Sequence, residues 1–180
     1  LEELLKKSSM SLFLISGLIF LLINTNIGDI YNVVESINKI QGYSIAIPVV
    51  LIISISKLYT STIGCMNNII SNSNFYQYIL FFSIFSALSL FFLNIYFIEN
   101  IGLIGAAYST LIIIVVFNLL KIILVLVKLK IQPYSINSIK LFFIITVLYL
   151  IFSNLEFDFL SAISSLIIKS IIISIIYMSI

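Results

Sequence analysis

The chain has 180 residues, of which 62% are hydrophobic and 9% are charged, and its mean hydropathy is +1.26. Soluble domains carry about 25% charged residues, and a chain this short has no interior large enough to bury so much apolar surface. The composition therefore excludes a water-soluble globule. The net charge of +2 is too small to indicate a nucleic-acid partner.

The side-chain inventory also limits the chemistry. The sequence has no His and one cysteine, Cys65, which excludes Ser-His-Asp triads, Cys-His pairs and His- or Cys-based zinc sites. No acid pair and no nucleotide-binding glycine loop is present, so we do not expect an enzyme. We also expect no cofactor and no metal.

The first seven residues are typical of a helix that is already under way. Residues 6–23 have the basic start and apolar middle of a signal peptide, but no small-residue cleavage site follows and five more apolar segments come later. We interpret this stretch as a membrane-spanning helix, and we expect the chain to be a piece of a longer protein.

Six stretches have roughly the 20 mostly apolar residues that a spanning helix needs. The predicted spans are residues 8–24, 43–65, 75–98, 101–127, 136–153 and 159–180. They should be helices, because backbone amides in hydrocarbon need partners within their own segment. The predicted fold is an all-α integral membrane protein with a six-helix transmembrane bundle. Only Glu99 and Asn100 separate the third and fourth spans, so these two helices are predicted to form a tight antiparallel hairpin.

Loop charges give the orientation, since Lys-rich loops stay in the cytoplasm. The lysines that mark the cytoplasmic side are Lys6, Lys7, Lys128, Lys130 and Lys140. The acids that mark the outer loops are Glu99, Glu156 and Asp158. Six crossings then place both chain ends in the cytoplasm. Residues 24–42 then form an outer loop. This loop is either a short amphipathic helix on the membrane surface or a partly ordered segment that stops at Gly42. The apolar residues at helical spacing are Ile30, Val33, Val34, Ile37 and Ile40.

Lys57 and Lys169 lie deep inside their predicted spans. A lysine at bilayer depth costs about 2.5–3.5 kcal/mol and usually faces a bundle interior or a wet cavity. Lys57 either faces such an interior or cavity, as a functional residue, or lies near the cytoplasmic interface, with its span ending near Tyr59. Lys169 is expected in a cavity or paired with a carboxylate outside this chain, because no acid lies inside a predicted span.

Other polar and small residues suggest local roles. The uncharged polar stretch 58–76 either caps and turns the chain or binds sugar hydroxyls or phosphate. Gly102, Gly105 and Ala106 are predicted to let two helix backbones approach closely. Asn94 and Asn118 are expected to form hydrogen bonds between helices.

Three motifs resemble a known family in their order and spacing. They are Lys57, Leu58, Gly64, Asn67, Asn68, Ile69, Ile70, Ser73 and Tyr76, then Asn94 with residues 98–110, and then residues 128–134. Together these motifs resemble the C-terminal part of bacterial O-antigen and lipopolysaccharide flippases of the multidrug/oligosaccharidyl-lipid/polysaccharide exporter superfamily. The resemblance covers roughly residues 8–150. Relatives usually have a Pro-containing turn where this chain has residues 97–100.

The resemblance implies a two-lobed transporter of the bacterial inner membrane, in which this chain is the C-terminal lobe and the N-terminal lobe is its partner. Such proteins move polyprenyl-pyrophosphate-linked oligosaccharide to the outer leaflet by alternating access through a cationic cavity. Lys57 would meet the diphosphate of this lipid-linked oligosaccharide, with Asn67, Asn68 and Tyr76 as polar neighbours, while the polyprenyl tail stays in membrane lipid.

Two other functions stay open. A multidrug or cation antiporter of the same superfamily should have an acid in its cavity, and no predicted span contains one. A non-transporting polymerase or scaffold subunit of polysaccharide assembly is the other alternative. A polymerase should have a large charged outer loop, whereas residues 24–42 form a modest one.

Overall fold

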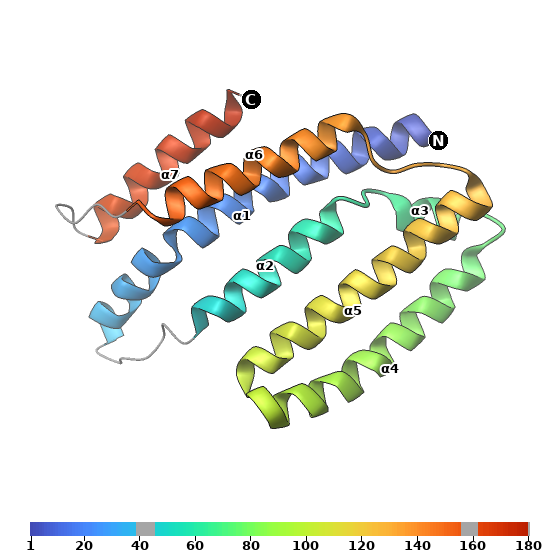
Figure 1. The fold of residues 1–180 in the computed structure, drawn as a ribbon, viewed down its shortest axis with the longest axis horizontal. Coiled ribbons are helices and arrows are strands. Elements are labelled where there is room, and N and C mark those ends of the chain that lie inside the picture. Colours follow the sequence, from blue (N-terminus) through green and yellow to red (C-terminus); the bar gives the residue numbers. More distant parts are fainter. Residues whose placement is uncertain (39–45, 156–161, 180) are drawn as a thin grey trace.

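The computed structural model describes residues 1–38, 46–155 and 162–179 (Figure 1). Over these residues the protein is all-helical, as predicted, with seven α-helices and one π-helical turn. The elements are α1 (Glu2–Asn38), α2 (Ile47–Ser61), α3 (Met66–Ser71), α4 (Tyr76–Ile101), α5 (Leu103–Leu124), η2 (Val125–Leu129), α6 (Ile136–Ser153) and α7 (Ala162–Met178).

Four helices are long and apolar enough to cross a membrane: α1, α4, α5 together with η2, and α6. The other two predicted spans are shorter. Helix α2 has 15 residues and α7 has 17, or about 22 and 25 Å at 1.5 Å per residue, against a hydrocarbon core of about 30 Å. The predicted helix end at residue 65 is wrong, because the chain leaves α2 at Ser61 and turns at Gly64, whose φ is +56°. The predicted starts at residues 43 and 159 lie outside the described residues.

Helix α1 is continuous over 37 residues, so the prediction of a first span that ends at residue 24 is wrong. The polar residues 24–26 do not cap the helix but donate to carbonyl oxygens one turn earlier. These bonds are Asn24 to Phe20 at 2.9 Å, Thr25 to Leu21 at 2.6 Å and Asn26 to Leu22 at 2.8 Å. The donor groups of these side chains are therefore satisfied inside the helix. The buried Oδ1 atoms of Asn24 and Asn26 have no hydrogen-bond partner among the described residues. Of the two alternatives for residues 24–42, the structure agrees with a helix as far as Asn38, but this helix continues α1 and is not a separate short element. Ile40 and Gly42 lie outside the described residues.

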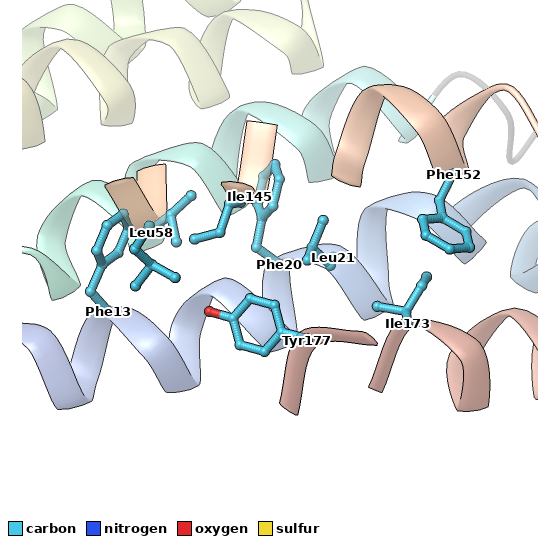
Figure 2. Packing of buried hydrophobic residues seen from close by; sticks show 9 residues of the cluster. Phe13, Phe20, Leu21, Leu58, Ile145, Phe152, Ile173 and Tyr177 are labelled. Atoms are coloured by element: carbon cyan, nitrogen blue, oxygen red, sulfur yellow. The ribbon is translucent and has the colours of Figure 1, made fainter. Parts of the chain in front are cut away.

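Helix α1 is the central element (Figure 1). It contacts α6, α7 and α2, and α2 then contacts α5, which in turn contacts α4. A cluster of buried apolar residues joins α1, α2, α6 and α7, and Figure 2 shows these side chains meeting between the helices. Its members are Phe13, Phe20, Leu21, Leu58, Leu141, Ile145, Phe152, Ile173 and Tyr177. Tyr177 adds a hydrogen bond of 2.8 Å from its hydroxyl to the carbonyl oxygen of Leu14.

A second buried cluster closes one end of the bundle. It contains Leu5, Ile63, Met66, Ile70, Ile122, Leu124, Val125 and Ile131. The start of α1, the segment between α2 and α4, and the end of α5 therefore meet there. Gly64 lies so close to Ser9 that a Cβ would be 2.6 Å from the Ser9 backbone nitrogen. The lysines of residues 6–7 and 128–130 belong to these segments, so the structure gathers them at one end.

The α4–α5 hairpin turns later than predicted. Glu99 and Asn100 lie in the last turn of α4, and the reversal occurs at Gly102, which has φ +68° and ψ −146°. Only glycine adopts this conformation without strain, so Gly102 serves the turn and has open space where a Cβ would stand. Gly105 is the residue of close approach, because a Cβ there would meet the carbonyl group of Phe97.

Polar side chains also join the helices. Ala106 follows Gly105 in the first turn of α5, where its carbonyl oxygen accepts from Ser109 at 2.9 Å. Ser109 also donates to Asn94 of α4, and Asn118 of α5 donates to Thr60 of α2 at 3.5 Å. The expectation that Asn94 and Asn118 form interhelical hydrogen bonds is therefore confirmed.

Candidate functional site

A buried ion pair joins the first and last helices. Lys169 of α7 donates from Nζ to Oδ2 of Asp29 on α1 at 3.1 Å, and Ser165 donates from Oγ to the same oxygen at 3.0 Å. The side chains of Lys169 and Asp29 are 7% and 19% exposed. Asp29 lies inside the candidate span Glu2–Glu35. The expectation that no acid in this chain could reach Lys169 is therefore wrong, and the continuation of α1 beyond residue 24 is the reason.

The ion pair belongs to a polar strip between α1 and α7. One turn before Asp29 on α1, Asn26 donates from Nδ2 to Oγ of Ser170 at 3.3 Å. Ser165, Asn26 and Lys169 are all buried. A charged pair this far from water is stable only with close geometry and additional hydrogen bonds, and Ser165 supplies one of them. Ionisable residues inside membrane segments usually mark a functional site, so this strip is one candidate.

Lys57 occupies a different environment. It lies one turn before the end of α2 at Ser61, close to the helix end that the interfacial interpretation places near Tyr59. Its side chain is exposed, and none of the ion pairs among the described residues includes it. It lines a cavity of about 330 Å³ between α1 and α2, whose other lining residues are Ser16, Ile19, Phe20, Ile23, Ile53, Ser54 and Leu58. The cavity thus combines one cation, two hydroxyls and an apolar wall.

The other predicted binding residues do not line this cavity. Asn67 and Asn68 are exposed on the short helix α3, and Tyr76 is 49% exposed at the start of α4. Asn68 lines a separate cavity of about 340 Å³, together with Leu1, Leu4, Cys65, Ile69, Asn72, Ser73 and Leu129. The structure therefore places Asn67, Asn68 and Tyr76 beyond the end of α2 and does not bring them together with Lys57 in one cavity.

Within the described ranges, no three His, Cys, Asp or Glu side chains come close enough together to hold a metal ion. The polar groups that the structure does gather are hydroxyls, amides and the Asp29–Lys169 pair. Such groups can bind an anion, a sugar hydroxyl or a proton.

Sequence reasoning missed Asp29 because residues 24–26 resemble a helix end. Two features of the sequence nevertheless favoured a continuous helix with Asp29 near Lys169. The apolar residues Ile30, Val33 and Val34 continue a helical spacing beyond Asn26, and Lys169 needed a carboxylate. An unbroken α1 puts Asp29 on the same face as Asn26, because residues three apart lie side by side on a helix.

Comparison of the chain with protein-family models, with curated proteins and with solved structures finds no match. The assignment to a function therefore depends on the residues, their geometry and the resemblance of the three motifs.

Proposed function

We propose that this chain is a six-helix transmembrane lobe of a bacterial inner-membrane flippase that moves polyprenyl-pyrophosphate-linked oligosaccharide for the synthesis of surface polysaccharide. The observation that carries the proposal is the exposed Lys57 beside the cavity between α1 and α2. Outside this chain, the proposed partner is the N-terminal lobe of the same transporter.

The chemistry of the cavity suits this cargo. A pyrophosphate that crosses a bilayer needs a cation along its path, and Lys57 is an exposed cation on an otherwise uncharged helix. Ser54 offers a hydroxyl beside it for sugar hydroxyls, whereas the Ser16 hydroxyl in the same lining is already hydrogen-bonded to Ser61. The exposed apolar surface of α4, which has no buried residue, suits contact with lipid or with a second lobe.

The arrangement of the helices supports the proposed orientation. The start of α1, the segment between α2 and α4, and the end of α5 lie at one end of the bundle. These segments include Lys6, Lys7, Lys128 and Lys130, and the positive-inside rule assigns that end to the cytoplasm. The two shorter helices, α2 and α7, would cross with local thinning of the bilayer.

Export of surface polysaccharide in cells that carry variants of the full-length protein tests the role of Lys57. We expect Lys57→Met to reduce export strongly and Lys57→Arg to restore much of it, because Arg keeps the charge. Lys140→Gln is the matched control, since it removes one exposed lysine on α6 that lies outside the cavity. Normal export with Lys57→Met, at normal protein abundance, would remove the proposed role of this residue.

Asp29 favours a second candidate, an antiporter of the same superfamily. A carboxylate inside a membrane helix can bind and release a proton or a cation during transport. In this structure Lys169 already compensates the charge of Asp29, so a cation would have to displace it. Efflux of a cationic dye in vesicles separates the candidates: efflux that needs a proton or sodium gradient and is abolished by Asp29→Asn supports the antiporter.

A further inference from the structure

An open groove runs along the α4–α5 hairpin. Its volume is about 750 Å³, within the range of about 300–1,000 Å³ that ligand sites occupy. It is lined by Gln77, Tyr78, Phe81, Phe82, Leu120, Ile123, Leu124, Val127 and Lys128. None of these residues lines the Lys57 cavity.

Most of the groove is apolar, and part of its lining packs against the second buried cluster. Leu124 is 8% exposed and forms part of the second buried cluster, against which Phe82 packs. Phe82 also meets Phe117 of α5 edge to face, with ring centroids 6.3 Å apart. By contrast, Phe81 and Ile123 are 59% and 54% exposed. The groove therefore has a packed floor and open apolar walls, which suits a flexible hydrocarbon chain.

The polar residues of the groove lie at one end. Gln77 is in the first turn of α4, and Lys128 follows the last turn of α5. Because the two helices are antiparallel, these two residues meet at the same end of the hairpin, away from the turn at Gly102. Lys128 is exposed, and the lining residues include no acid. An occupant with an anionic end and an apolar body fits this distribution.

We propose that the groove binds an anionic glycerophospholipid, with its phosphate at Lys128 and Gln77 and one acyl chain along Phe81, Phe82 and Ile123. Both helices are long and apolar enough to span a membrane, so the groove opens toward bilayer lipid. Basic pockets between transmembrane helices bind anionic lipid headgroups in this way. The lone cation at one end of an apolar groove favours this amphiphile over a protein segment, which would have to bury Lys128 or pair with it.

Native mass spectrometry of the full-length protein in mild detergent tests the site. The probes are phosphatidylglycerol and phosphatidylcholine with identical acyl chains. We expect Lys128→Gln to weaken the binding of phosphatidylglycerol about fivefold, equivalent to the roughly 1 kcal/mol of one lysine near an anionic lipid surface, and to leave phosphatidylcholine unchanged. Lys140→Gln, which removes another exposed lysine, on α6, should change neither.

A groove-filling variant tests the acyl-chain site separately. Ile123→Trp places a large side chain in the groove at an exposed position, so the buried clusters stay intact while retention of phosphatidylglycerol falls. A phosphatidylglycerol with a diazirine on its acyl chain should label peptides that contain residues 78–82 or 120–127. The proposal is overturned by equal retention of the two lipids, by equal effects of the two lysine variants, by retention unchanged in Ile123→Trp, or by binding of polyprenyl phosphate alone.

Discussion

The ion pair between Asp29 and Lys169 should contribute strongly to the stability of the bundle. Removal of one partner from a buried pair costs about 3–5 kcal/mol, because the other charge stays buried without compensation. Asp29 keeps 19% exposure, which places the expected loss near the lower end, at about 3 kcal/mol. For a unit of 180 residues, this corresponds to a decrease of about 6–12 °C in melting temperature, and the decrease is smaller in a longer chain that unfolds as one unit.

A double-mutant cycle isolates the pair. Asp29→Asn and Lys169→Met keep the side-chain volumes nearly constant and remove one charge each, and the double variant removes both. We expect the double variant to be more stable than the sum of the single losses predicts, by at least about 1 kcal/mol. The melting temperature of the full-length protein in lipid nanodiscs is the measurement.

Glu99 provides a matched control. It is exposed in the last turn of α4, so Glu99→Gln removes one carboxylate charge without breaking a buried contact and should change the melting temperature little. Two outcomes would show that the pair does not join α1 to α7. In the first, Asp29→Asn and Lys169→Met lower the melting temperature as little as Glu99→Gln does. In the second, the effects of the two single substitutions add without coupling.

Three smaller effects on the melting temperature of the same sample should follow from single contacts. Gly105→Ala should cost about 1–3 kcal/mol, because its Cβ would meet the Phe97 carbonyl and push the two helices apart; a neutral change would contradict the close approach. Ser135→Ala should cost about 1 kcal/mol, since the Ser135 hydroxyl accepts from the Ser138 backbone N–H at 3.3 Å and caps α6, whereas the exposed Ser153→Ala at its other end should cost less. Tyr177→Phe should cost about 1 kcal/mol by removing the hydrogen bond to Leu14, and an unchanged melting temperature would argue against that bond.

The apolar runs allowed the helical class and several helix positions to be predicted from the sequence. Helix α6 has the predicted bounds, because Ser135 caps its start and the apolar run ends at Ser153. The segment between η2 and α6 contains the buried Pro133. Pro48 lies in the first turn of α2, where a missing backbone N–H removes no helical hydrogen bond.

Two features were not predicted from the sequence, the continuation of α1 beyond residue 24 and the pairing of Asp29 with Lys169. Asn24, Thr25 and Asn26 have the side chains of a typical helix cap, but in α1 they bond to the preceding turn and the helix continues. Asp29 and Lys169 are 140 residues apart along the chain and meet only because α1 and α7 pack against each other. Local patterns carry no information about that pairing.

The most direct test of the proposed function is to deplete the full-length protein in its host and to examine lipid extracts by mass spectrometry. The flippase proposal predicts that complete polyprenyl-pyrophosphate-linked oligosaccharide accumulates on the cytoplasmic side while surface polysaccharide disappears. If complete units still reach the outer leaflet but long chains do not form, the protein acts after transport, in polymerisation or assembly, and the proposal is wrong.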